Sequence, residues 1–218
     1  MKKKVIFFVS IALIIFLVYY NRLFSSIISI DTEVFINNRN ALVYSWFSIG
    51  RFTLGIMKNI FLSIIILALA LYIYATDIFN KSKKFNYFAV GVTILFVVTS
   101  PLVAEQYYFT LQALEISIGY LLIVILMKLI NKYIYSNKKI LVIPIVIGLG
   151  FLFGIYQSFI LLYIALSIIY FIVYNFKKEK KLKEYLIIIS KYIGLLILGV
   201  ITYYILNKLF MNYYNIES

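Results

Sequence analysis

The chain contains no cysteine and no histidine, and only eight of its 218 residues are acidic. Thiolate nucleophiles, imidazole bases, disulfides and Cys/His zinc sites are therefore excluded. Any acid–base chemistry must use carboxylates, of which there are few. The chain also has only two prolines, Pro101 and Pro144. Long stretches therefore lack the residue that most often interrupts a helix.

Apolar residues, by contrast, are abundant. They make up 64% of the chain, with a mean hydropathy of +1.00, whereas soluble domains contain about 45–50%. The apolar runs are continuous rather than alternating and reach the length of about 20 residues that a spanning helix needs, which favours helices over a transmembrane barrel. We predict an all-α, polytopic transmembrane helical bundle of about seven spans, forming a single transmembrane domain over residues 1–218. The predicted spans are residues 4–21, 59–76, 87–104, 109–130, 140–156, 158–176 and 186–206.

The first apolar run follows three lysines, Lys2, Lys3 and Lys4, and so resembles the start of a signal peptide. No cleavage site of the A-x-A type follows it, and the run is long. We therefore expect a retained first span rather than a removable signal peptide.

The basic residues predict the orientation. With a cytoplasmic N-terminus, fifteen of the 21 lysines and arginines lie on the cytoplasmic side, as the positive-inside rule requires. This bias accounts for the net charge of +13 through anionic lipid, without nucleic acid. Abundant Ile, Lys, Asn and Tyr indicate an AT-rich bacterial genome, so we expect a multi-pass protein of a bacterial plasma membrane.

One predicted loop, residues 22–58, is much longer than the others and rich in apolar residues. Loops of this length usually have a function or structure of their own. We expect amphipathic interfacial helices here, on the outer membrane surface, with Tyr44 and Trp46 at the level of the lipid headgroups.

The same loop contains two carboxylates, Asp31 and Glu33, and two guanidiniums, Arg39 and Arg51. A carboxylate near the outer surface can act as a general base, and a guanidinium binds phosphate through paired hydrogen bonds. The alternative is structural: Asp31 precedes a plausible helical run and could cap its N-terminus.

Further polar residues lie at the predicted outer ends of the later spans. Glu105 lies in a short outer turn, while Tyr108, Gln112 and Glu115 are spaced to share one helix face. An ionisable group within a span usually faces a cavity or a partner, although Glu115 could also reach interfacial water. Gln157 lies in another outer turn, where a structural role is the alternative. Gly148, Gly150 and Gly154 indicate close helix packing.

Four segments resemble the Gtr-type glucosyltransferases, a family of polytopic membrane proteins of the polyprenyl-phosphate-sugar-dependent, GT-C-like kind. These segments are Ile30-Asp31-Thr32-Glu33, the stretch from Ser45 to Phe52 that contains Trp46 and Arg51, the stretch from Ser100 to Phe109, and Gly154-Ile155-Tyr156-Gln157-Ser158. They occur in the same order as in the family, and all lie at the outer face of the predicted topology.

The resemblance implies an enzyme that takes a sugar, glucose by the family's name, from a polyprenyl-phosphate carrier and places it on a cell-surface glycan or polymer. It implies Asp31 as the catalytic base together with Glu33, and Arg51 and Arg39 as donor phosphate-binding residues. The residues implied to bind sugar or acceptor are Trp46, Glu105, Tyr108, Gln112, Glu115 and Gln157. No cofactor is expected, with a divalent metal at Asp31, Glu33 or Glu105 as the alternative.

This chain departs from the family pattern in length, because family members continue into further spans. We therefore expect residues 1–218 to correspond to the N-terminal part of a longer glycosyltransferase. Two alternatives stay open: a flippase or transporter of lipid-linked sugars, and a non-catalytic membrane subunit. Against a transporter, the sequence has no repeated pair of Gly- or Pro-broken spans.

Overall fold

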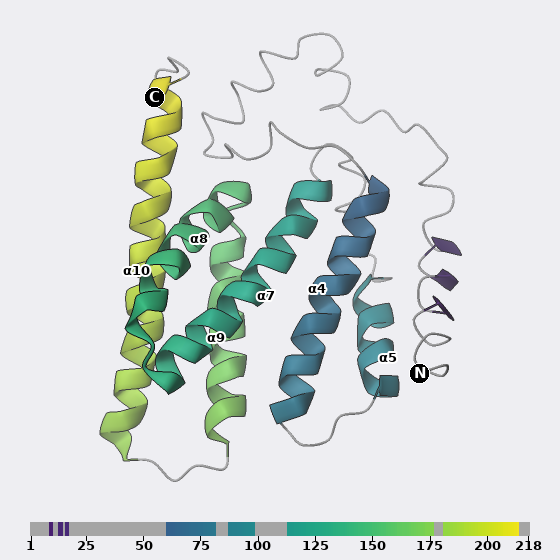
Figure 1. Cartoon of the computed structure of the whole chain (residues 1–218), viewed down its shortest axis with the longest axis horizontal. Coiled ribbons are helices and arrows are strands. Elements are labelled where there is room, and N and C mark those ends of the chain that lie inside the picture. Colours follow the sequence, from purple (N-terminus) through teal and green to yellow (C-terminus); the bar gives the residue numbers. More distant parts are fainter. Residues whose placement is uncertain are drawn as a thin grey trace. The chain divides into compact units, whose positions relative to one another are not determined.

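The computed structural model describes residues 9–10, 13–14, 16–17, 60–81, 87–98, 113–176 and 181–213. All regular structure in these residues is helical, which confirms the all-α prediction for this part of the chain (Figure 1). The elements are α4 (Ile60–Lys81), α5 (Tyr87–Val98), α7 (Ala113–Ser136), the 3₁₀ helix η2 (Lys139–Leu141), α8 (Val142–Ile155), α9 (Phe159–Asn175) and α10 (Leu182–Tyr213).

The chain forms two compact units. The first comprises Met1–Leu42 and Met57–Ile118, and the second comprises Val43–Ile56 and Gly119–Ser218. In the first unit α4 packs against α5. Val90, Ile94 and Val98 of α5 are buried and lie four residues apart, so they form one face of the helix.

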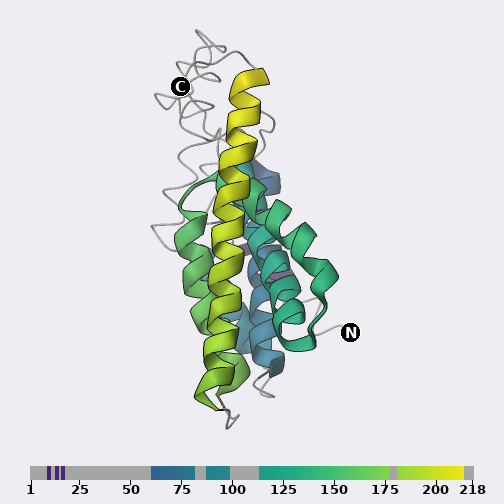
Figure 2. The same cartoon turned by 90° about the vertical axis from the view of Figure 1, so that its left-hand side faces the viewer.

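The second unit is organised around α10, the longest of the described helices, along which α8 packs (Figure 2). Two glycines permit this approach. A Cβ at Gly199 would lie 2.8 Å from the Cβ of Leu149, and a Cβ at Gly150 would lie 2.7 Å from Cγ2 of Thr202. The second unit therefore uses glycine where two helices are closest.

Gly148 brings α8 close to α7, because a Cβ there would lie 2.7 Å from Cδ2 of Leu126. At Gly119 of α7 a Cβ would meet the ring of Phe159 of α9. The predicted packing role is confirmed for Gly148 and Gly150, and Gly154 is buried in the same helix.

The connections between these helices are short and locally determined. Asn137, with φ of 53°, adopts the left-handed conformation directly after α7 ends, which Asn tolerates better than most residues. Pro144 lies in the first turn of α8, where the missing N–H has no intrahelical partner to lose. A turn at residues 156–158 reverses the chain between α8 and α9, with the Phe159 N–H donating to the Tyr156 carbonyl at 3.0 Å.

Within the described part of the chain, two helices, Leu114–Ser136 and Leu182–Tyr213, are long and apolar enough to cross a membrane, and the other apolar helices there are shorter. Much of the α10 surface is exposed and apolar, including Leu186, Ile193, Ile197 and Ile201. A row of exposed apolar side chains along one helix is unfavourable in water and indicates contact with lipid. The chain is therefore membrane-associated.

The predicted span boundaries were too short at the charged ends. α4 continues to Lys81, α7 to Ser136, and α10 runs from Leu182 to Tyr213, whereas breaks were predicted from residues 77 and 131 and the last span at 186–206. The physical reason is that helical hydrogen bonding does not require apolar side chains, so a helix can continue past its apolar run while lysines extend their charges toward water. The first predicted span, apart from six helical residues, and the interfacial helices of residues 22–58 lie outside the described residues.

Candidate functional site

Most of the residues predicted to form the site lie outside the described residues. These are Asp31, Glu33, Arg39, Trp46, Arg51, Glu105, Tyr108 and Gln112. Their assignments as catalytic, phosphate-binding and sugar-binding residues stay predictions. The structure describes two members of the predicted site, Glu115 and Gln157, which belong to different compact units and are therefore considered separately.

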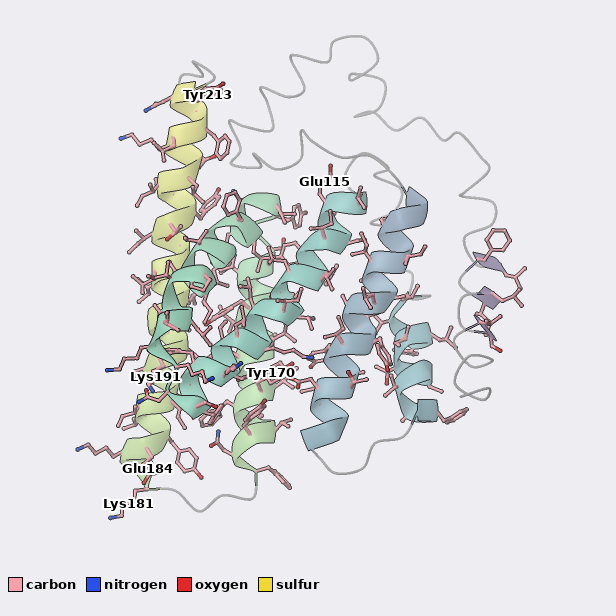
Figure 3. All side chains as sticks on the ribbon, in the orientation of Figure 1. Glu115, Tyr170, Lys181, Glu184, Lys191 and Tyr213 are labelled. Atoms are coloured by element: carbon pink, nitrogen blue, oxygen red, sulfur yellow. The ribbon has the colours of Figure 1, made fainter. Side chains whose placement is uncertain are left out.

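Glu115 lies in the first turn of α7, the one acidic residue there (Figure 3). The predicted start of this span at residue 109 lies outside the described residues, and α7 is described from Ala113. At a helix N-terminus the backbone dipole favours a negative charge. The side chain is buried, with 4% of its surface exposed, so it does not lie on the open surface.

Gln157 lies in the exposed turn between α8 and α9. Its Nε2 donates a hydrogen bond to the hydroxyl of Tyr203 on α10, at 3.0 Å. This contact ties the turn to the long helix, as the structural interpretation of Gln157 predicts. Gln157 is exposed, and none of its described contacts tests whether it binds sugar. A sugar-binding role for Gln157 therefore stays a prediction.

A chain of buried polar groups joins three helices of the second unit. The Tyr192 hydroxyl on α10 donates to Oδ1 of Asn131 on α7 at 2.6 Å, and the Tyr163 hydroxyl on α9 donates to the Tyr192 carbonyl at 2.9 Å. All three residues are at most 5% exposed. Polar side chains among apolar helices must find partners with one another, so this chain determines how α7, α9 and α10 fit together.

A second polar cluster joins α7 and α9 near the end of the bundle at the α9–α10 connection. Nδ2 of Asn175 donates to the Tyr135 hydroxyl at 2.9 Å and to the Phe171 carbonyl at 2.7 Å. The rings of Tyr135 and Tyr174 stack with their centroids 4.7 Å apart. This cluster therefore joins the end of α7 to the end of α9.

Lysines concentrate at the same end. Figure 3 shows Lys181 and Glu184 at the start of α10 and Lys191 further along, whereas Tyr213 lies at the opposite end. The Lys191 ammonium lies 5.4 Å from the centroid of the Tyr133 ring, a cation–π contact that stabilises a charge within an apolar helix.

A groove of about 240 Å³ lies between α9 and α10. α9 contributes Tyr163, Ile164, Ser167, Ile168 and Phe171, and α10 contributes Ile189, Tyr192, Ile193 and Leu196. The helices touch at few points, and the walls of the groove are almost wholly apolar. Its composition suits a hydrocarbon ligand and offers nothing for sugar or phosphate.

Among the described residues, no three His, Cys, Asp or Glu side chains come together as a group that could hold a metal ion. Asp31, Glu33 and Glu105, the carboxylates named as ligands in the alternative with a metal, lie outside this part of the chain.

The helices, the exposed apolar surface of α10 and the buried polar chain define a membrane-associated helical protein, and the comparisons place it among enzymes. The family model described as Glucosyl transferase GtrII matches residues 20–218, so the chain belongs to this family and is a glycosyltransferase. No curated protein and no solved structure matches the chain.

Sequence reasoning missed the buried polar chain and the α9–α10 groove. Asn131 was interpreted as the first residue of a polar break, although it continues α7. One signal was present: Tyr163, Ser167 and Tyr170 are spaced i, i+4 and i+7, which places small and aromatic polar groups on one face of α9. The partner residues on α7 and α10 leave no comparable signal.

Proposed function

We propose that this glycosyltransferase moves a glucosyl unit from a polyprenyl-phosphate carrier to a cell-surface glycan or polymer, at the outer face of a bacterial plasma membrane. The observation that carries the proposal is the family match over residues 20–218, which covers every residue of the predicted site. The lipid-facing surface of α10 supports it, because an enzyme that uses a lipid-borne donor must meet that donor within the bilayer.

In the proposed reaction the acceptor hydroxyl attacks the anomeric carbon of the donor sugar. Its proton passes to the carboxylate of Asp31, the new glycosidic bond forms, and the bond to the carrier phosphate breaks. The phosphate leaves with the bonding electrons and stays on the lipid, where Arg51 and Arg39 neutralise its charge. Glu33 supports the base, and Trp46, Glu105, Tyr108, Gln112, Glu115 and Gln157 contact the sugar and the acceptor.

The proposed topology places the N-terminus and the α9–α10 connection in the cytoplasm. Lys181 and Lys183 at the start of α10, with Lys138 and Lys139 after α7, support this placement, since lysines favour the cytoplasmic side. The α8–α9 turn with Gln157 then lies at the outer face, the side of residues 22–58.

No resident metal is proposed, and transfer that persists in EDTA would agree with this.

The test is transfer of radiolabelled glucose in proteoliposomes. Full-length parent protein receives polyprenyl-phosphate glucose and glycan isolated from the host cell envelope. Asp31→Asn should lower kcat at least about 100-fold, because a general base contributes about 10²–10⁴-fold. Asp77→Asn is the matched control, since Asp77 lies near the end of α4, on the proposed cytoplasmic side, and should transfer at the parental rate.

Two results would contradict the proposal. Equal transfer by the parent and Asp31→Asn would remove this carboxylate from the mechanism. Movement of the labelled lipid across the bilayer without transfer to glycan would instead indicate a flippase.

A further inference from the structure

The groove between α9 and α10 is open to one side and closed at one end. Phe171 of α9 and Tyr185 of α10 meet with their ring centroids 5.9 Å apart and their planes at 71°. This edge-to-face pair bridges the two helices at the end of the groove nearest the α9–α10 connection. A ligand in the groove therefore extends the other way, toward the end of the bundle with the α8–α9 turn.

Hydrogen bonds hold the floor of the groove. Tyr163 and Tyr192 both line it, and the Tyr163 hydroxyl donates to the Tyr192 carbonyl at 2.9 Å. Tyr192 is in turn bonded to Asn131, so the hydroxyls of both tyrosines are engaged and their rings form the lining. The groove therefore does not need to reorganise before a ligand enters.

The walls are formed by branched aliphatic side chains, among them Ile164 and Ile168 on α9 and Ile189 and Ile193 on α10. Ile168 and Ile193 are 54% and 51% exposed, so the groove opens on the lipid-facing surface. An apolar cavity of about 150 Å³ is enough to hold one benzene molecule. The larger α9–α10 groove therefore has room for a short stretch of a methyl-branched chain.

We infer that the α9–α10 groove binds the polyprenyl chain of the carrier, in the isoprene units close to the phosphate. The inference rests on the proposed function. Closure of the groove at the cytoplasmic end favours a lipid whose phosphate lies at the outer face over a phospholipid of the inner leaflet.

The depth of the groove agrees with this. From the turn at Ser158 to Ile164 and Phe171, the 1.5 Å rise per residue gives depths of about 9 and 20 Å below the proposed outer face. A chain descending from an outer phosphate would pass through this depth.

The test is photo-crosslinking of the full chain in lipid nanodiscs. The probe is polyprenyl phosphate that carries a diazirine in the isoprene units near the phosphate. We expect the label on peptides from Phe159–Asn175 and Leu182–Tyr213, with unlabelled polyprenyl phosphate competing and phosphatidylglycerol failing to compete. Equal competition by phosphatidylglycerol, or a label elsewhere in the chain, would overturn the inference.

Matched isoleucines supply the variants. Ile164 lines the groove and Ile169 lies on the opposite side of α9, and both are 39% exposed. Ile164→Trp should fill the groove and reduce crosslinking about tenfold, equivalent to about 1.4 kcal/mol, whereas Ile169→Trp should leave it unchanged. On α10, Ile193→Trp and its control Ile187→Trp repeat the comparison, so misfolding of one variant does not decide the result. Equal labelling of groove and control variants on both helices would refute the inference.

Transfer assays separate this inference from the proposed function. Ile164→Trp should raise KM for a long-chain donor and leave KM unchanged for a short-chain donor that does not reach the groove. In one outcome the parent protein transfers sugar from both donors while Ile164→Trp has the parental KM for each of them. That result refutes binding of the polyprenyl chain in the groove but retains the assignment as an enzyme. A parent that crosslinks in the groove but transfers no sugar refutes the proposed reaction alone.

Discussion

Asn131 and Tyr192 show how a single polar pair acts inside a membrane bundle. The Tyr192 hydroxyl satisfies Oδ1 of Asn131 at 2.6 Å, while Nδ2 of the same amide is buried without a hydrogen-bond partner. A buried amide that is only half satisfied costs free energy, and removing its one partner costs more. The pair therefore stabilises one particular arrangement of α7 against α10, although it leaves the Nδ2 donor of Asn131 without a hydrogen-bond partner.

Tyr192→Phe should therefore destabilise the second unit by about 0.6 kcal/mol and at most about 1.7 kcal/mol, the mean and the maximum measured for hydrogen bonds between membrane helices. The double variant Asn131→Leu/Tyr192→Phe should recover most of this loss, because apolar groups then replace both partners. Unfolding in detergent, followed by circular dichroism, measures both. A double variant as unstable as the sum of its single variants would show that the pair does not act as a unit.

At the scale of the elements, the α8–α10 contact depends on the absence of side chains at chosen positions. Gly199 lies against Leu149 with no room for a Cβ, whereas nothing lies within 4 Å of a Cβ built at Gly194, five residues earlier in α10. The two glycines share a helix and differ in their surroundings. They therefore offer a direct test of helix packing.

Gly199→Ala should separate α8 from α10 and lower the free energy of unfolding by about 1–3 kcal/mol, the usual cost of overpacking. Gly194→Ala should be neutral or should stabilise the helix by up to about 1 kcal/mol, since alanine is the better helix former. Thermal unfolding of the detergent-solubilised variants compares them directly. Equal loss of stability in both would indicate that the α8–α10 approach is not set by Gly199.

At the scale of the whole molecule, charge and hydropathy predict the placement of each end of the helices relative to the membrane. The chain lacks cysteine, so single-cysteine variants report on topology without background labelling. Ser136 ends α7 and Ser158 lies in the α8–α9 turn, and both are exposed.

In intact cells a membrane-impermeant maleimide should label Ser158→Cys but not Ser136→Cys, because the proposed orientation places them on opposite sides. Permeabilised cells should label both, which controls for accessibility. Ser29→Cys, close to Asp31, should behave like Ser158→Cys. Protection of Ser29→Cys in intact cells would place Asp31 on the cytoplasmic side and contradict the proposed mechanism.

Much of the architecture follows from the sequence alone. Continuous apolar runs predict helices because lipid forces each backbone group to bond within its own segment, and the run from Phe159 to Asn175 was predicted to within one residue at each end. The four segments with Asp31, Arg51, Glu105 and Gln157 predicted the family, which the match over residues 20–218 confirms. Composition excluded thiol and imidazole chemistry because the necessary atoms are absent.

Only the tertiary structure decided which side chains meet across helices. The Asn131–Tyr192–Tyr163 chain, the close approach at Gly199 and the α9–α10 groove each depend on how separate helices rotate and cross. The physical reason is that apolar residues surround a membrane helix on nearly all sides. Hydropathy therefore marks where a helix lies along the chain but not which face it turns to its neighbours, and packing of small and polar groups determines that face.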